Sequence, residues 1–226
     1  AQAEVERNGL AEIEIYMGQK VAPGFFAWLV PTTPGRAWAG LLSRKRPGAH
    51  LRQFLAKLHA EGKILSPQAN ISYGLVPLQP RPRSYGERIL AVGDAAGQVK
   101  PTTAGGIYYS LLSADMAAQT LHRALCSNDF APGHLSQYQR EWKKRLGHEL
   151  QVGYWARRFY EKLGDPQIEE IVQHIRSSGF LQSVLQAEDF SFDWHSITIV
   201  KAMGRQALPL FLRAMARSIL PFKEKG

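Results

Sequence analysis

The sequence has 226 residues, of which 45% are hydrophobic and 21% charged, which is the composition of an ordinary globular protein. Its single cysteine, Cys126, excludes an internal disulfide framework and a cysteine-rich zinc site, and we expect it to be a buried or half-buried small residue. The formal net charge of +9 favours anionic partners, but no basic run with interleaved aromatic residues is present, so we do not expect nucleic-acid binding.

The first part of the chain predicts an antiparallel meander. Residues 11–17 alternate with period two, residues 25–30 are rich in aromatic and β-branched side chains, and residues 36–42 return after a proline-rich turn. A helix is expected next, because Leu51, Phe54, Leu55 and Leu58 share a helical face and Gly62 marks its end.

The pattern then changes twice along the chain. Residues 72–78 predict another strand, and the apolar run 89–92 suits a strand buried on both faces, as in a parallel sheet. From about residue 105 the period is helical: one helix is expected to bury Leu111, Leu112, Met116 and Leu121, and a later one Leu135, Tyr138 and Trp142. Asp165 and Pro166 predict the N-cap and first turn of a further helix over residues 167–175.

The most informative segment is residues 89–107, ILAVGDAAGQVKPTTAGGI. It predicts a strand, an aspartate (Asp94) at its carboxyl end, a loop, and a helix opened by Gly105 and Gly106. A carboxylate there can accept hydrogen bonds from sugar hydroxyls, and the glycines allow a ligand to approach amides that carry partial positive charge at the helix N-terminus. The alternative is a tight turn that only caps the helix.

Three pieces of this segment carry a resemblance: Gly93 to Gly97, then Pro101-Thr102, then Gly105-Gly106-Ile107. Together they resemble the second flavin-contact motif of flavoproteins of the p-hydroxybenzoate hydroxylase type, and the ending PTTAGGIYYS is most similar to the geranylgeranyl reductase family. The resemblance implies FAD contacts from Gly93, Asp94, Pro101, Gly105, Gly106, Ile107 and Tyr108. Ala104 stands where many relatives have glycine.

A second stretch supports the same family. Residues 23–31, PGFFAWLVP, are similar to the aromatic-x-Trp-x-x-Pro signature on the substrate sheet of these reductases, which implies a substrate-binding role for Phe26, Trp28, Val30 and Pro31. On a strand, Phe26, Trp28 and Val30 project to one face, where they can line a slot for an isoprenoid chain. The alternative is an aromatic stripe that only packs the core.

The Gly-x-Gly-x-x-Gly turn that holds a cofactor pyrophosphate does not occur in this sequence. We therefore expect an α+β chain with part of the p-hydroxybenzoate-hydroxylase-like fold, without its N-terminal nucleotide-binding segment, as a fragment or a processed protein. The expected divisions are an antiparallel substrate sheet with one helix (1–76), the end of the FAD-binding domain (77–125) and a helical C-terminal region (126–226).

The predicted function is FAD-dependent reduction of carbon–carbon double bonds in a geranylgeranyl or other prenyl group, with the chain inactive alone. A flavin monooxygenase or halogenase of the same superfamily, and a non-catalytic lipid-binding domain, stay open as alternatives. No catalytic acid is identified, since core packing explains Tyr108 and Tyr109 equally well, and the histidines lack zinc-ligand spacing. We expect a cytoplasmic protein with a prenyl-lipid substrate. Its apolar, arginine-bearing stretch 205–222 offers either a packed terminal helix or shallow membrane contact.

Overall fold

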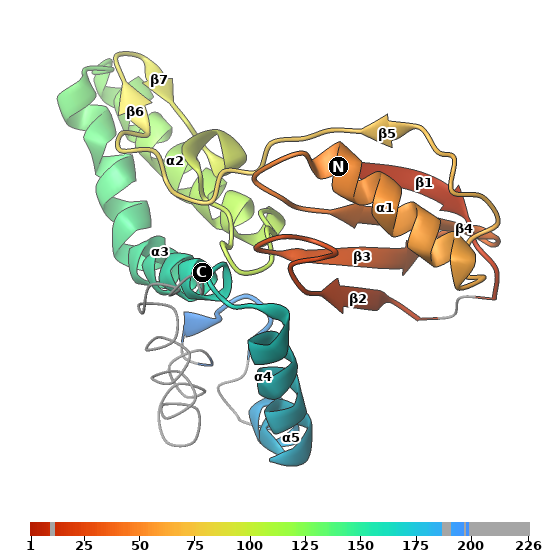
Figure 1. Cartoon of the computed structure of the whole chain (residues 1–226). Coiled ribbons are helices and arrows are strands. Elements are labelled where there is room, and N and C mark those ends of the chain that lie inside the picture. Colours follow the sequence, from red (N-terminus) through yellow and green to blue (C-terminus); the bar gives the residue numbers. More distant parts are fainter. Residues whose placement is uncertain (10–11, 187–190, 197, 199–226) are drawn as a thin grey trace, which may run out of the picture. The chain divides into compact units, whose positions relative to one another are not determined.

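The computed structural model describes the chain except residues 10–11, 187–190, 197 and 199–226. It divides into two compact units (Figure 1). The first contains Ala1–Leu75 and Phe159–Phe180, and the second contains Val76–Arg158 and the described residues that follow Phe180.

A five-stranded antiparallel sheet organises the first unit, with strand order β2-β3-β4-β1-β5. Its strands are β1 (Gln2–Glu6), β2 (Glu14–Met17), β3 (Phe26–Pro31), β4 (Arg36–Leu41) and β5 (Ile71–Ser72). The neighbours β2, β3 and β4 confirm the predicted meander. Strand β1 was not predicted, and it lies inside the sheet, where Ala3 pairs with Ala39 of β4 and Ile71 of β5.

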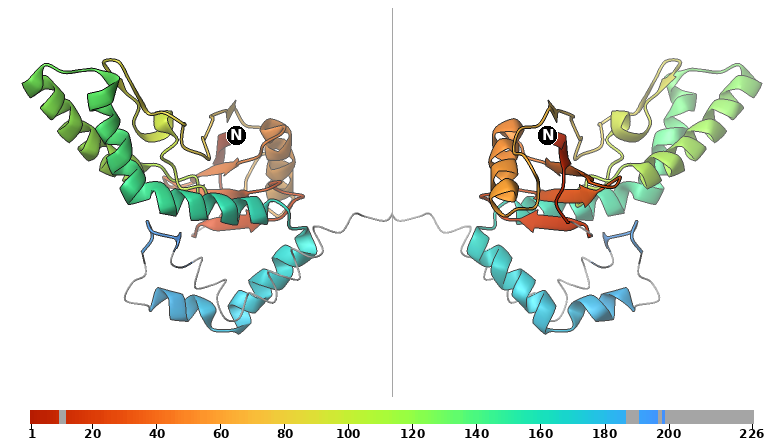
Figure 2. Two further views of the ribbon diagram at one scale, coloured as in Figure 1. Left: turned by 90° about the vertical axis from the view of Figure 1, so that its left-hand side faces the viewer. Right: turned by 90° about the vertical axis from the view of Figure 1, so that its right-hand side faces the viewer.

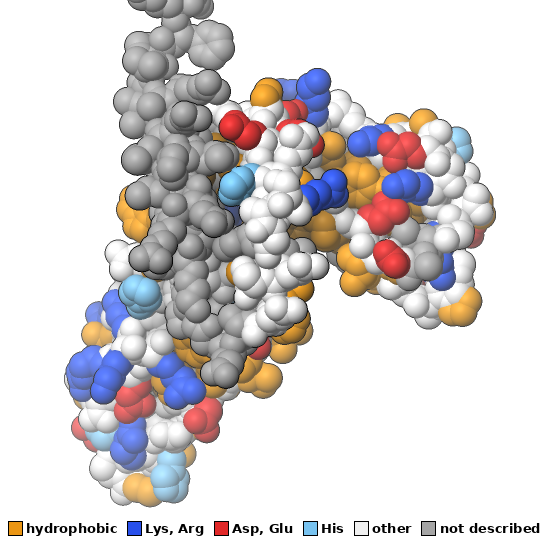
Figure 3. Space-filling view, turned by 90° about the horizontal axis from the view of Figure 1, so that it is seen from below, with side chains coloured by type: hydrophobic (Ala, Val, Ile, Leu, Met, Phe, Trp, Pro, Cys, Tyr) orange, Lys and Arg blue, Asp and Glu red, His pale blue; other side chains and the backbone are white. Residues whose placement is uncertain are grey.

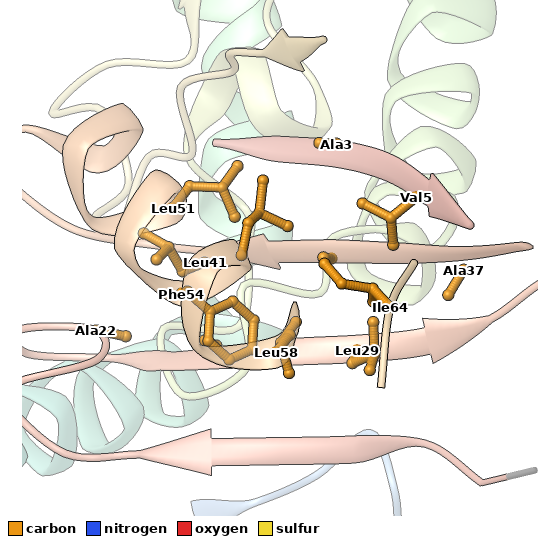
Figure 4. Packing of buried hydrophobic residues seen from close by; sticks show 13 residues of the cluster. Ala3, Val5, Ala22, Leu29, Ala37, Leu41, Leu51, Phe54, Leu58 and Ile64 are labelled. Carbon is orange, nitrogen blue, oxygen red and sulfur yellow. The ribbon is translucent and has the colours of Figure 1, made fainter. Parts of the chain in front are cut away.

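One face of this sheet is covered by helix α1 (Pro47–Ala60), which lies along it in both views of Figure 2. As predicted, the helix buries Leu51, Phe54, Leu55 and Leu58. Figure 4 shows three of these side chains directed at the inward residues of the strands, among them Leu29 and Leu41. Gly62 follows the helix with φ +70°, a conformation that suits glycine at a helix end. The described core of this unit therefore lies on the side of the sheet that α1 covers.

The predicted strand over residues 72–78 is wrong beyond Ser72. Tyr73 and Leu75 are 63% and 98% exposed and belong to no strand. The reason is the register: β5 runs antiparallel to β1 and reaches Gln2, the first residue of β1, at Ser72. The described pairing of β5 with β1 therefore ends at Ser72.

The second unit begins with a short hairpin of β6 (Tyr85–Gly86) and β7 (Ile89–Leu90). This corrects the prediction of a strand buried on both faces in a parallel sheet, since β7 pairs antiparallel with β6 and Ile89 is 63% exposed. A run of four apolar residues indicates a strand with two buried faces only where other strands and a second layer surround it. Among the described residues, β7 has one neighbouring strand, β6. The 3₁₀ turn η1 (Gly93–Ala96) follows.

Helices α2 (Ile107–Ser127) and α3 (Pro132–Tyr160) form the core of this unit (Figure 1). The burial of Leu135, Tyr138 and Trp142 is confirmed. On α2 the predicted face is partly wrong: Leu112 and Met116 pack at the edge of the core, but Leu111 and Leu121 are 65% and 38% exposed. The residues that α2 buries are mostly small: Tyr109, Ser113, Ala117, Thr120 and Ala124. Tyr109 and Ala117 share a core with large side chains of α3, among them Tyr138 and Trp142.

Helices α4 (Asp165–Ser177) and α5 (Phe180–Leu185) follow along the chain. Gly164, and not Asp165, is the N-cap residue of α4, and its N–H donates to the Gln167 side chain. The Asp165 carboxylate instead accepts a hydrogen bond from the N–H of Gln19. Among the described helices, none is long and apolar enough to cross a membrane.

Two further expectations concern the later part of the chain. Cys126 is exposed, contrary to the prediction, because it lies off the buried stripe of α2 that ends with Thr120 and Ala124. The apolar stretch 205–222 lies outside the described residues, so its predicted packing or membrane contact stays a prediction.

Candidate functional site

The turn at Gly93 is built around a residue without a side chain. Gly93 has φ +63°, and a Cβ atom there would lie 2.6 Å from Oγ of Ser110 in α2. Its N–H donates to the buried Gln98 Oε1 at 2.7 Å, and the Gln98 amide in turn donates to the Tyr138 hydroxyl at 2.9 Å. Gln98 was not identified from the sequence, yet this fully buried amide holds the turn against α3.

Asp94 and Gly106 are brought together, although twelve positions separate them in the sequence. Gly106 is the N-cap residue of α2, and a Cβ atom there would lie only 2.6 Å from Asp94 Oδ1. The exposed Asp94 carboxylate therefore lies against the backbone of Gly106. No side chain caps this helix end and its first turn holds no acidic residue, so the positive end of the helix dipole faces Asp94 and any ligand beside it.

The loop between Asp94 and α2 is fixed by its own backbone. The Lys100 N–H donates to Gly105 O at 3.0 Å, and the Ala104 N–H donates to Lys100 O at 2.8 Å. Ala104 adopts φ +58°, in the left-handed region that favours glycine, so its side chain is strained there. Pro101 is buried against α3, where a Cβ atom at Gly153 would lie 3.1 Å from its Cδ.

A second segment, residues 191–196, here called the strap, binds this loop from a distant part of the sequence. Lys100, which is 9% exposed, forms an ion pair with Asp193 and donates to Phe192 O at 3.1 Å. Oγ1 of Thr102 lies 2.7 Å from Nδ1 of His195. Nothing in the local pattern of residues 191–196 distinguishes the strap, so sequence reasoning missed it.

The two tyrosines after Gly106 differ in their surroundings. Tyr109 is buried, and its hydroxyl donates to Asp193 O at 2.8 Å. Burial, followed by the charges of Glu149 and Asp193, raises the pKa of Tyr109 well above its usual value, so the hydroxyl keeps its proton. Tyr108 is half-buried beside Trp194, with ring centroids 6.2 Å apart. Neither tyrosine is assigned a catalytic role.

Charge is not concentrated on the face drawn in Figure 3, where Lys and Arg side chains alternate with Asp, Glu and hydrophobic ones. Within the described part of the chain, no group of three His, Cys, Asp or Glu residues is arranged to hold a metal ion.

The predicted substrate residues lie in the first unit, on β3. Phe26, Trp28 and Val30 are half-buried and project from the sheet face opposite to α1, while Ala27 and Leu29 between them enter the core. Their cross-strand neighbours continue this apolar face: Ile15 pairs with Trp28, Met17 with Phe26, and Trp38 with Val30. Ile15, Met17 and Trp38 are 53%, 47% and 37% exposed. We call these six residues the apolar sheet face. Pro31 ends β3, paired with Ala37.

A pocket of about 580 Å³ adjoins this face at the open edge of β2. Ile15 and Met17 line one side, α1 contributes Phe54, and α4 contributes Ile168 and Val172. Polar and charged side chains also line it, including Lys20, His50, Lys57 and Asp165. The volume is within the range of about 300–1,000 Å³ found for small-molecule sites.

No protein-family model matches the sequence. It is 29% identical over 170 residues to digeranylgeranylglycerophospholipid reductase 2 of Methanothermobacter thermautotrophicus, a match that covers 72% of this chain and 43% of that protein. It is 28% identical over 170 residues to the digeranylgeranylglycerophospholipid reductase of Methanocaldococcus jannaschii, covering 74% and 44%. The chain thus spans less than half the length of these relatives.

Among solved structures, a geranylgeranyl bacteriochlorophyll reductase-like protein from Thermoplasma acidophilum matches with a TM-score of 0.73 and 22% identity, over 96% of this chain and 54% of that one. This likeness shows that the chain shares the fold of that protein, a mixed fold of helices and an antiparallel sheet. The matches together confirm the resemblance to geranylgeranyl reductases that the sequence motifs indicated.

Proposed function

We propose, on the premise that the chain is homologous to the geranylgeranyl reductases, that it is part of an FAD-dependent reductase of carbon–carbon double bonds in a geranylgeranyl or other prenyl group. The observation that carries the proposal is the Asp94 carboxylate held beside Gly106 at the uncapped N-terminus of α2. If Asp94 served only as a helix cap, its carboxylate would accept hydrogen bonds from the first amides of α2. No side chain caps this helix end, so these amides stay available for a ligand.

The residues present fit one end of a flavin. Asp94 can accept hydrogen bonds from ribityl hydroxyls, and the lack of a side chain at Gly106 gives its carboxylate space beside the backbone. The lack of a side chain at Gly105 lets a flat ring edge approach the backbone there. The amides that follow Gly106 can stabilise negative charge at the N1/C2 edge of a reduced ring. Bound FAD supplies the hydride for such a reduction.

The sequence provides no cradle for the FAD pyrophosphate. We propose that a nucleotide-binding segment supplies it, either earlier in the same protein or as a separate chain. The part of the molecule described here would then bind FAD weakly or not at all on its own, and would be inactive alone.

The apolar sheet face is the proposed seat of the substrate. Its half-exposed Phe26, Trp28 and Val30, extended by Ile15 and Met17 to the pocket at β2, offer a long apolar surface. Such a surface suits an isoprenoid chain, whose binding depends on apolar area removed from water. The chain's role in this step is to bind and align the substrate, and no residue is assigned as its proton donor.

Two rival functions make different demands. A flavin monooxygenase or halogenase would use Asp94 and Gly106 but has no need of the apolar sheet face. A non-catalytic lipid-binding domain would use the apolar sheet face but has no need of the carboxylate at the α2 N-terminus. The presence of both features in one chain favours the reductase. We further propose a cytoplasmic protein that contacts the membrane surface, because its substrate is a lipid and its net charge is +9.

The test has two parts. FAD is measured by absorbance in the purified chain, where stoichiometric FAD retained through purification would overturn the proposed dependence on a separate phosphate cradle. A protein that also contains the nucleotide-binding segment is then incubated with reduced FAD and a geranylgeranyl lipid. Mass spectrometry should show the gain of one H₂ for each double bond reduced. Incorporation of oxygen or halogen instead would identify one of the rival enzymes.

A further inference from the structure

Lys100 carries its positive charge at a place that disfavours a cation. The residue lies in the loop before α2 and is 9% exposed. Its ammonium lies 5.6 Å and 5.9 Å from the ring centroids of Tyr109 and Tyr108, which belong to the first turn of the helix. Because a helix N-terminus carries partial positive charge, a cation there is repelled by the dipole, and burial has also removed its hydration. A lysine in this position therefore needs negative charge beside it.

Asp193 of the strap supplies part of that negative charge. Its carboxylate forms the ion pair with Lys100, whose ammonium also donates to Phe192 O at 3.1 Å. The two partners differ in burial, since the side chain of Lys100 is 11% exposed and that of Asp193 is 37% exposed. Water screens the more exposed carboxylate better than the ammonium, and it screens the exposed Asp94 carboxylate beside Gly106 in the same way. The ion pair therefore leaves a net positive potential within the loop.

The Lys100 side chain runs beside the backbone of Gly105, where the flavin ring edge is proposed to approach. A Cβ atom at Gly105 would lie 3.9 Å from Cδ of Lys100, and Nζ is two bonds further along the same side chain. The Lys100 N–H donates to Gly105 O at 3.0 Å, which holds the lysine and the glycine together. The positive charge of Lys100 therefore belongs to the same site as the ring edge.

We infer that the Lys100 ammonium stabilises the reduced form of the flavin, and that Asp193 limits this effect by pairing with Lys100. Two electrons from a reductant such as dithionite, with one proton from water, convert the oxidised ring to a reduced ring that carries one negative charge at its N1/C2 edge. The ion pair then sets how much more tightly the chain holds reduced flavin than oxidised flavin, because charge near this edge tunes the ring. This inference rests on the proposed function, which supplies the flavin.

The experiment measures the two-electron midpoint potential of FAD in a protein that also contains the nucleotide-binding segment, by dithionite titration followed by absorbance. Lys100→Met should lower the potential, because the reduced ring loses a nearby cation. The binding of reduced relative to oxidised FAD should weaken about tenfold, which is a shift of about 30 mV for a two-electron couple. Asp193→Asn should raise the potential, because the charge of Lys100 is no longer paired. Lys144→Met, at an exposed lysine of α3, is the matched control and should leave the potential unchanged.

The opposite signs decide the question, because both substitutions break the same ion pair. If Lys100 and Asp193 only hold the strap on the loop, the two variants should shift the potential in the same direction or leave it unchanged, and either result overturns the inference. The double variant with Lys100→Met and Asp193→Asn buries no unpaired charge, so it serves where circular dichroism shows that a single variant does not fold. Its potential should lie between those of the natural protein and Lys100→Met, and a potential at or above the natural value overturns the inference.

The flavin content separates this inference from the proposed function. A protein that contains the nucleotide-binding segment but retains no FAD would contradict the proposed reductase, and the role of Lys100 with it. FAD that is retained, with a potential that neither Lys100→Met nor Asp193→Asn changes, would leave the reductase in place and remove only the effect of the Lys100 charge on the reduced flavin.

Discussion

Trp28 and Gly40 are directly paired across β3 and β4, on the sheet face away from α1. The indole of Trp28 lies flat over Gly40, so that a Cβ atom at Gly40 would be 2.4 Å from Cζ2 and 2.7 Å from Nε1. Gly40→Ala therefore forces the indole to move. We predict that this substitution destabilises the protein only while Trp28 is present.

The magnitudes follow from the packing. Overpacking of this kind costs about 1–3 kcal/mol, and alanine recovers roughly 0.5–1 kcal/mol over glycine in a strand. Gly40→Ala should thus lower the free energy of unfolding by about 0.5–2 kcal/mol in the natural sequence. In a Trp28→Ala background the space is open, and the same change should be neutral or stabilising by up to about 1 kcal/mol. The coupling free energy between the two positions is then roughly 1–3 kcal/mol.

The four proteins of this cycle are compared by urea unfolding at one temperature, with circular dichroism as the signal because two of them lack Trp28. An equal cost of Gly40→Ala in both backgrounds would refute the reasoning, since it would show that the indole does not occupy the space above Gly40. Cooperative transitions with similar slopes are required for the comparison.

The cycle also separates two roles of Trp28. Its indole is half-buried on the apolar sheet face, and therefore Trp28→Ala should cost less than the roughly 3–5 kcal/mol seen for fully buried aromatic residues. In a flavin-loaded intact enzyme, Trp28→Ala should weaken prenyl-substrate binding and leave the flavin content nearly unchanged. A loss of stability at the full core value, with substrate affinity preserved, would show a packing role only.

Three other predictions concern single positions. Ala104→Gly should raise the free energy of unfolding by about 1 kcal/mol. Glycine removes the strain of roughly 1–2 kcal/mol that alanine has at φ +58°, but the greater chain entropy of glycine in the unfolded state offsets part of this stabilisation. A lower melting temperature would contradict the prediction. In an intact enzyme, Asp94→Ala should reduce FAD affinity by an amount equivalent to about 1.5–3 kcal/mol, because charge-assisted hydrogen bonds are lost, and should change thermal stability little. A variant that loses thermal stability and keeps its flavin would instead identify Asp94 as a helix cap. Hydrogen bonds from Lys63 and Tyr16 lower the pKa of Glu14 in the folded protein. The ionised carboxylate therefore stabilises the fold at pH values above its unfolded-state pKa. This stabilisation is lost as the pH falls through the lower pKa of the folded state. The difference in unfolding free energy between the natural protein and Glu14→Gln should therefore be largest near neutral pH and disappear in acid, and a difference independent of pH would refute the assignment.

Sequence reasoning succeeded where a feature depends on residues close together in the chain. The alternation in β2 and β3 and the apolar face of α1 are local, and each survives in the structure because a single face of each element enters the core. Strand β1 was missed for the opposite reason. Its alternation is short and its inward residues Ala3 and Val5 are small, so its place depends on pairing with β4, some thirty-five residues later in the sequence.

The error on α2 has a different origin. Size was used as the sign of burial, which selected Leu111 and Leu121, whereas the helix packs on α3 through small residues such as Ser113 and Ala117. Small residues form the core stripe of α2 because large side chains of α3, such as Tyr138 and Trp142, fill the shared core, and the sequence of α2 alone does not reveal that partner.

The proposed flavin contact is supported by hydrogen bonds and an ion pair within the protein. Gln98 fixes Gly93, the backbone of Lys100 closes the loop to Gly105, and the strap holds the Lys100 side chain through Asp193. All of these contacts are made within the protein, and together they hold the position of Asp94 beside Gly106. A site organised in this way loses little conformational freedom on binding. Weak FAD binding by the chain alone would therefore reflect the missing phosphate contacts, and not a disordered ring-edge site.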